Sequence, residues 1–135
     1  MRFAAGLLIF AIGSLLFAVI AIFVASEMSG EVVRMRSFDA NGRPEETRLW
    51  VVDYGDHTYL RGRPASGWYR RVVLVPEVEL ERGGEVQRFR VVPSQHLREP
   101  INELMSEKYG LGDQLIAVMR DMNEVVPLRL DPLGP

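Results

Sequence analysis

The sequence predicts an α+β protein in which one apolar N-terminal helix precedes a six-stranded, mainly antiparallel β-barrel with short helices. Three observations lead to this prediction. The chain opens with a long uncharged segment, six short segments have the pattern of strands, and three further segments carry apolar residues at helical spacing. We therefore expect an N-terminal transmembrane anchor over residues 1–28 and a barrel domain over residues 29–135.

The N-terminal segment is typical of a single-pass membrane anchor. Residues 3–25 contain no charged side chain, and a helix of that length extends about 34 Å, enough to cross a hydrocarbon core of roughly 30 Å. A cleaved secretory signal is the alternative, although its apolar region usually has only about 7–15 residues. Arg34 and Arg36 follow the segment closely, whereas Arg2 alone precedes it, and this distribution favours a cytoplasmic domain.

Six short strands are expected in the barrel domain. They cover residues 31–38, 46–53, 58–62, 78–82, 85–92 and 126–130. Tight turns are indicated between most of them, at Asn41-Gly42, Gly55-Asp56 and Gly83-Gly84. Connections this short favour antiparallel pairing. Because alternate residues of a strand share a face, Val78 and Leu80 should point into the core.

Three helices are expected among these strands. They cover residues 66–75, 97–109 and 112–122. Ser66 is placed to cap the first of them, and Pro76 follows its end. Gly110 can end the second helix.

Composition and motifs exclude several kinds of site. The net charge of −2 provides no basic field, so no nucleic-acid partner is expected. The absence of cysteine excludes disulfides, thiolate metal sites and cysteine nucleophiles. His57 and His96 lie far apart in the sequence, outside any metal-ligand spacing, so no metal site is expected. Neither a serine nucleophile elbow nor a dinucleotide-binding glycine motif occurs.

A cluster of positive charge interrupts this mildly acidic chain. Residues 57–76 hold four arginines and no acid; the arginines are Arg61, Arg63, Arg70 and Arg71. Arg61 and Arg63 leave the end of a strand, and Ser66 with Gly67 opens a helix, whose N-terminus carries free N–H groups and partial positive charge. This combination favours a site for a phosphate or carboxylate.

Two tryptophans accompany the arginine cluster. Trp50 and Trp68 provide flat surfaces suited to a ring system. Solvated arginines and core tryptophans are the alternative interpretation of the same residues.

The stretch TRLWVVDYGDHTYLRGRPASGWYRRVVLVPEVELERGG resembles the FMN-binding split-barrel superfamily, and most of all its nitroreductase and quinone-reductase branch, which includes deazaflavin-dependent nitroreductases. The order and spacing of TRLWVV, YGDH, TYLR, SGWYRRV and VPEVEL carry the resemblance, which extends over residues 32–131. It implies a split barrel that binds FMN or a deazaflavin coenzyme at the barrel edge and that pairs as a homodimer.

The resemblance also implies where the cofactor binds. In such proteins the phosphate end meets basic residues near strand ends and in the loop before the short helix. In this chain the implied cofactor-binding residues are Arg48, Trp50, Arg61, Arg63, Ser66, Gly67 and Trp68. No catalytic residue is assigned, and the candidate proton donors are Tyr54, His57, Tyr59 and Tyr69.

The resulting expectation is a membrane-anchored oxidoreductase that uses a flavin or deazaflavin to reduce a quinone or nitroaromatic-type acceptor. An anchor suits an acceptor that is dissolved in the bilayer. The alternative is a non-enzymatic, membrane-tethered split-barrel binding module that has lost the cofactor. The hairpin DANGRPEE favours this alternative, because Asp39, Glu45 and Glu46 stand where deazaflavin-dependent members usually carry a basic, glycine-rich hairpin.

Overall fold

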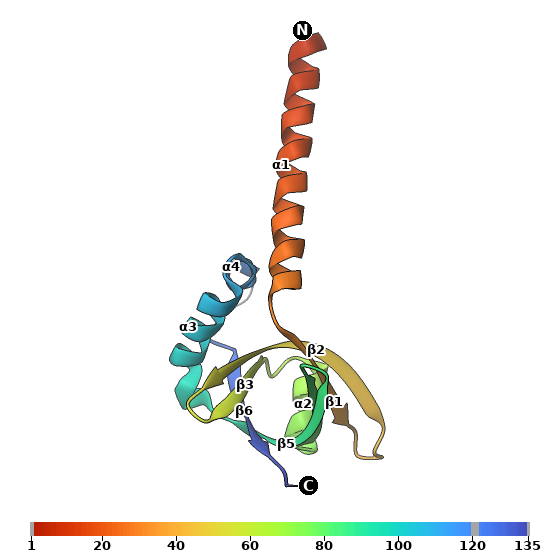
Figure 1. The fold of residues 1–135 in the computed structure, drawn as a ribbon, viewed down its shortest axis with the longest axis vertical. Helices are drawn as coiled ribbons and strands as arrows, with labels where there is room; N and C mark the ends of the chain where they lie inside the picture. Colours follow the sequence, from red (N-terminus) through yellow and green to blue (C-terminus); the bar gives the residue numbers. More distant parts are fainter. Residues whose placement is uncertain (1, 120–121, 135) are drawn as a thin grey trace.

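The computed structural model describes residues 2–119 and 122–134 and confirms the predicted α+β class (Figure 1). In chain order the elements are α1 (Arg2–Ser29), β1 (Val32–Phe38), β2 (Pro44–Tyr54), β3 (His57–Gly62), α2 (Gly67–Leu74), β4 (Glu77–Arg82), β5 (Glu85–Pro93), the 3-10 helix η1 (Gln95–Leu97), α3 (Arg98–Tyr109), α4 (Leu111–Met119) and β6 (Val126–Pro132). Every predicted strand and helix is present, with boundaries shifted by a few residues. The predicted extension of the last helix covers residues 120–121, which lie outside the described residues, and residue 122 is in a turn.

The six strands close into a barrel in the order β1-β2-β3-β6-β5-β4, and each neighbouring pair is antiparallel. The prediction of a mainly antiparallel barrel is therefore confirmed. The turn between β4 and β5 shows why the local signals were sufficient. Gly83 and Gly84 have φ values of +58° and +80°, the left-handed conformation that a two-residue type I′ hairpin requires at both positions.

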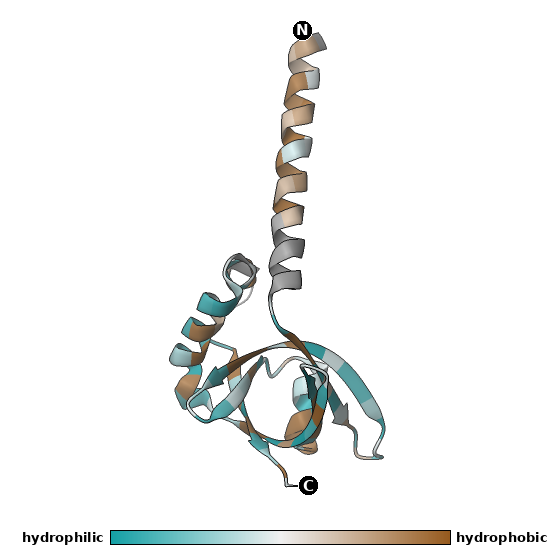
Figure 2. Ribbon diagram, in the orientation of Figure 1, coloured by the Kyte–Doolittle hydropathy of each residue, from teal (hydrophilic) through white to brown (hydrophobic). Residues whose placement is uncertain are grey.

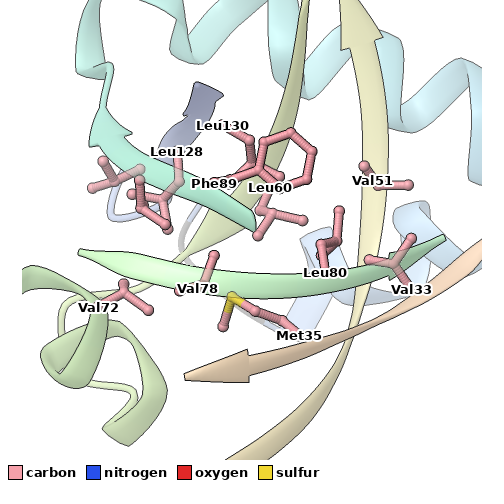
Figure 3. Close-up of a cluster of buried hydrophobic side chains, with 12 residues drawn as sticks. Val33, Met35, Val51, Leu60, Val72, Val78, Leu80, Phe89, Leu128 and Leu130 are labelled. Carbon is pink, nitrogen blue, oxygen red and sulfur yellow. The ribbon is translucent and has the colours of Figure 1, made fainter. Parts of the chain in front are cut away.

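The barrel interior is the main hydrophobic core (Figure 3). Alternate residues of the strands point inward, so β4 buries Val78 and Leu80 as predicted, with exposed fractions of 1% and 2%. Helix α2 adds Val72 to this cluster. The other buried members are Val33, Met35, Val51, Leu60, Phe89, Val91, Val126, Leu128 and Leu130.

A second apolar cluster lies outside the barrel wall and positions α3. It joins Val52 of β2 and Tyr59 of β3 to the buried face of α3. That face consists of Ile101, Met105 and Tyr109. Val51 and Val52 thus point to opposite sides of one strand, one into the barrel and the other towards α3. This arrangement fixes α3 against the outer face of β2 and β3.

Helix α1 extends away from the barrel as a separate rod (Figure 1). Its residues Phe3–Ala21 are long and apolar enough to cross a membrane, and none of this segment is buried against the domain. Figure 2 shows that most of the coloured residues along this helix are hydrophobic. The chain then passes through Gly30 and Glu31 into β1.

Candidate functional site

A cavity of about 330 Å³ lies where β2, the end of β3 and the start of α2 meet α3 and α4. This volume falls at the lower end of the range for small-molecule sites, about 300–1,000 Å³. The lining residues are Arg48, Leu49, Trp50, Arg61, Gly62, Arg63, Ser66, Trp68, Met105, Ile116, Met122 and Val125.

Six of the seven predicted cofactor-binding residues line this one cavity. They are Arg48, Trp50, Arg61, Arg63, Ser66 and Trp68. The seventh, Gly67, is the first residue of α2 and does not belong to the lining. The structure therefore brings the predicted residues of β2, β3 and the following loop together, and their role towards a cofactor stays a prediction.

Arg61 is already engaged by the protein. Its guanidinium forms an ion pair with Asp113 of α4 and donates a hydrogen bond of 3.1 Å to the side-chain oxygen of Asn102 of α3. The Arg61 and Asp113 side chains are only 9% and 5% exposed. The positive charge of Arg61 is thus balanced by Asp113 within the fold. The Arg61 side chain connects α3 and α4 to the barrel.

Arg48 and Arg63 are differently placed. Within residues 2–119 and 122–134, the side chains of both lack a hydrogen-bond or ion-pair partner. The Nε of Arg63 is buried, and a buried donor without a partner is costly unless a ligand or water satisfies it. These two arginines are the cations that the cavity offers to an anionic ligand.

The start of α2 adds donors beside these arginines. Ser66 occupies the N-cap position of the helix, as predicted, but its hydroxyl makes no capping hydrogen bond. The side chain also lines the cavity. A helix N-terminus carries partial positive charge and unsatisfied N–H groups, so this end of the cavity is electropositive.

The two tryptophans are partly buried and also line the cavity. Trp50 stacks on Tyr109 of α3, with ring centroids 4.3 Å apart and an angle of 6° between the planes. Trp68 meets Tyr69 edge to face at 6.3 Å. Gly62 permits this approach, because a Cβ atom at that position would lie 2.8 Å from Trp68 and 2.7 Å from Tyr69.

The apolar side of the cavity comes from segments for which the sequence analysis predicted no role in a site. Met105 belongs to α3, Ile116 to α4, and Met122 and Val125 to the segment before β6. Helical spacing predicted an apolar face that included Met105 and another that included Ile116, but it did not indicate what these faces would cover.

None of the candidate proton donors lines the cavity. His57 lies 3.5 Å from the carboxylate of Asp131, Tyr59 is buried, and Tyr54 contacts Tyr59. Tyr69 contacts Trp68, which lines the cavity, but does not itself belong to the lining. Three of these groups lie in β2 and β3 instead, and the role of all four as proton donors stays a prediction.

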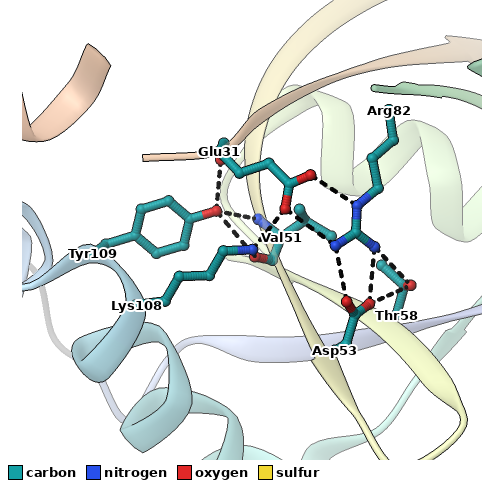
Figure 4. A network of polar contacts seen from close by, with 7 residues as sticks. All are labelled: Glu31, Val51, Asp53, Thr58, Arg82, Lys108 and Tyr109. Carbon is teal, nitrogen blue, oxygen red and sulfur yellow. Dashed lines mark hydrogen bonds and ion pairs between the residues drawn. The ribbon is translucent and has the colours of Figure 1, made fainter. Parts of the chain in front are cut away.

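A polar network connects the base of α1 to the barrel (Figure 4). Arg82 of β4 donates hydrogen bonds of 2.9 and 3.1 Å to the Glu31 carboxylate and of 2.8 and 2.9 Å to the Asp53 carboxylate. These bonds lower the pKa of Asp53 to about 2 and also lower the pKa of Glu31, while the two carboxylates raise the pKa of Arg82.

The same network reaches the end of α3. Lys108 donates to the Glu31 carboxylate and to the Val51 carbonyl, both at 2.7 Å. The Tyr109 hydroxyl accepts a hydrogen bond from the Val51 N–H at 2.9 Å and lies 2.6 Å from the Glu31 carbonyl oxygen. Burial raises the pKa of Tyr109. Glu31 thus fastens the segment after α1 to β4 and to α3.

Comparison with known proteins identifies the fold. No protein-family model matches the sequence, and no relative is found among curated proteins. Among solved structures, the heme storage protein HutZ of Vibrio cholerae has a TM-score of 0.63 and 15% identity, covering 82% of this chain and 87% of its own. A putative pyridoxamine 5′-phosphate oxidase from Listeria innocua gives 0.60 and 15%, with 82% and 90% covered. An F420 reductase gives 0.53 and 12%, with 77% and 87% covered. At these identities the comparisons show that this chain has the barrel fold of those proteins.

Proposed function

We propose that this protein is a membrane-anchored oxidoreductase that binds FMN or a deazaflavin coenzyme in the cavity beside α2. The observation that carries the proposal is that one cavity joins two tryptophans to two arginines whose side chains have no partner among the described residues. The fold shared with an F420 reductase and a putative pyridoxamine 5′-phosphate oxidase supports the class of protein.

The electropositive end of the cavity fits the anionic part of such a cofactor. Arg48 and Arg63 offer guanidinium donors, and Ser66 offers a hydroxyl at the start of α2. Binding of a phosphate or carboxylate would satisfy the buried Nε of Arg63. Arg61 would contribute indirectly, because its ion pair with Asp113 keeps α4 in place over the cavity.

The aromatic and apolar residues of the same cavity lining fit a planar ring. Trp50 and Trp68 present aromatic surfaces, and Met105 with Ile116 adds apolar contacts that exclude water. The volume of about 330 Å³ suits a ring system, with the rest of the cofactor extending into the open mouth. When bound, the cofactor would supply hydride transfer to a quinone or nitroaromatic-type acceptor. The residues of this chain would orient the ring and neutralise its anionic tail.

An anchor on the membrane suits an acceptor that partitions into lipid. We propose that α1 is retained and that the barrel lies on the cytoplasmic side, as Arg34 and Arg36 suggest. We also propose that the protein forms a homodimer. Light scattering of the protein–detergent complex tests this, because the protein mass should be that of two chains.

A non-enzymatic, membrane-tethered binding module is the second candidate. Two of the side chains predicted to contact a cofactor contact other residues of the protein instead. Trp50 stacks on Tyr109, and Arg61 pairs with Asp113. The acids of the β1–β2 hairpin also have structural partners. Asp39 accepts hydrogen bonds of 2.9 Å from the N–H groups of Asn41 and Arg43, and Glu45 lies 2.8 Å from Arg71.

One purification distinguishes the two candidates. The full-length protein is purified in mild detergent, and its absorbance spectrum is recorded before and after denaturation. A released flavin or deazaflavin, or saturable binding of FMN or a deazaflavin coenzyme to the colourless protein, supports the oxidoreductase. If the protein releases no cofactor and binds neither compound, the result supports the non-enzymatic binding module.

A further inference from the structure

The outward face of α4 is exposed and uncharged over the side chains that the structure describes. Gly112 and Asp113 are buried and Ile116 lines the cavity, so these residues face the barrel. Gln114, Leu115 and Ala117 are exposed, and Leu115 is 42% exposed. Residues 114–119 carry no charge. A surface helix whose outer side has lost its charged residues indicates contact with something other than bulk water.

This helix lies beside the base of α1. The two helices are in contact, and Figure 1 shows α4 at the level where α1 meets the barrel. The side-chain contacts lead to the same place. Lys108 and Tyr109 end α3, one residue before α4 begins, and both contact Glu31, two residues after the end of α1. These contacts therefore hold the start of α4 close to the C-terminal end of α1.

Counting along α1 gives the depth at which α4 would lie in a membrane. The apolar run ends at residue 25 and the helix at Ser29, so about 6 Å of helix extend beyond the apolar segment. The headgroup layer on each side of a bilayer is roughly 5–8 Å thick. Glu31, and with it the start of α4, therefore falls at the outer limit of the headgroups.

We propose that the outward face of α4 docks on the same bilayer that α1 crosses, with Leu115 at the boundary of headgroups and acyl chains. This inference rests on the proposed retention of α1, and it requires no cofactor. The bilayer is favoured over a protein partner because this uncharged face lies beside the base of a helix that is long and apolar enough to cross a membrane. It also brings the cavity under Ile116 close to the lipid, where a lipid-soluble acceptor is concentrated.

Single-cysteine probes test the docking. The natural sequence has no cysteine, so Leu115→Cys, Ala117→Cys, Ile12→Cys and Leu74→Cys each give one labelling site. Each variant carries an environment-sensitive fluorophore, and the full-length protein is reconstituted in lipid nanodiscs. Quenching by nitroxides on the lipid acyl chains is compared with quenching by aqueous iodide. Ile12 reports on the anchor, and Leu74, which is 81% exposed on α2, is the matched apolar control.

Docking predicts blue-shifted emission and several-fold stronger lipid quenching at positions 115 and 117 than at 74. If lipid nitroxides quench the probe at position 12 but not the probes at positions 115 and 117, the docking of α4 is overturned while α1 is still a membrane anchor. Absence of lipid quenching at 12 overturns the anchor and the docking together. Equal lipid quenching at 74 and 115 also contradicts the proposal, because the contact then does not belong to α4. The two positions on α4 are independent, so a fault in one variant does not decide the result.

Discussion

Arg61 of β3 and Asp113 of α4 form an ion pair that is almost closed to solvent, with side-chain exposures of 9% and 5%. Asn102 of α3 accepts a further hydrogen bond from the same guanidinium. A single side chain therefore connects the barrel wall to both helices that cover it. A buried pair of this kind adds little net stability over an apolar pair, but loss of one partner leaves a buried charge uncompensated.

Asp113→Ala should therefore lower the free energy of unfolding by about 3–5 kcal/mol. The measurement is denaturant unfolding of the full-length protein in micelles, followed by tryptophan fluorescence. Arg88→Ala is the control, since Arg88 is 60% exposed and pairs with Glu77 on the surface, and its loss should cost less than about 0.5 kcal/mol. Equal effects of the two substitutions would show that the pair does not hold α4.

Gly62 gives a prediction about packing beside the cavity. Gly62→Ala places a methyl group within 2.8 Å of the rings of Trp68 and Tyr69, which are held by their own contacts. Overpacking of this kind costs about 1–3 kcal/mol, and the displaced rings should lose part of their near-ultraviolet circular dichroism. Gly67→Ala is the matched control, because a methyl group there has no neighbour closer than 3.7 Å and should be neutral or slightly stabilising. A neutral Gly62→Ala would contradict the close approach.

The sequence predicted the fold because its signals are local. The pairing of β4 with β5 follows from Gly83-Gly84 and from the alternation around Val78 and Leu80. The position of β6 between β3 and β5, and of α3 on the outer wall, depends on contacts between distant segments. No periodicity within either segment indicates those neighbours.

The same contrast between local signals and long-range contacts explains which features of the site could be predicted. An arginine-rich stretch without acids was enough to locate the cavity, since Arg61, Arg63 and Ser66 all line it. The sequence did not show which arginine is free. Asp113 lies 52 residues from Arg61, and Tyr109 of α3 stacks on Trp50 from a similar distance along the chain. Which charges and rings remain for a ligand is decided by such long-range pairs.

The network around Arg82 predicts acid sensitivity. The pKa of Asp53 is lowered from 3.8 to about 2, and that of Glu31 is lowered from 4.5. A lowered pKa in the folded state gives stability that is present above the ordinary pKa and lost as the pH falls through the folded value. Unfolding free energy should therefore decline between about pH 4.5 and pH 2.

Asp53→Asn isolates one part of this effect. The Asp53 side chain is 57% exposed, so solvent screening limits its contribution to roughly 1 kcal/mol at pH 7. The difference in unfolding free energy between wild type and Asp53→Asn should shrink as the pH falls below about 4 and approach zero below pH 2. Asp56→Asn, which alters a neighbouring turn carboxylate outside the network, is the control. A pH-independent difference for Asp53→Asn would show that its ion pair with Arg82 is not the source.

Helix α1 makes a prediction about the intact chain. If α1 is retained as an anchor, full-length protein should stay in the membrane pellet after alkaline carbonate extraction, and its mass should include residues 1–25. A cysteine at exposed Gly134 should react with a membrane-impermeant maleimide only after the cells are opened, if the barrel is cytoplasmic. Recovery of a shortened, soluble chain would identify the N-terminal segment as a cleaved signal.

Arg63 and Arg48 carry the prediction on which the proposed site depends most. A charge-assisted hydrogen bond is worth about 1.5–3 kcal/mol, so Arg63→Ala should weaken binding of FMN or a deazaflavin coenzyme by roughly tenfold to a hundredfold. Arg48 is exposed, so Arg48→Ala should have the smaller effect. Arg70→Ala is the matched control, because Arg70 belongs to the same stretch but points its guanidinium at the Ala65 carbonyl, outside the cavity lining. The measurement is a fluorescence titration of the full-length protein at fixed ionic strength. If wild type binds neither compound, or if all three variants bind like wild type, the two arginines are solvated surface and the non-enzymatic module becomes the better account.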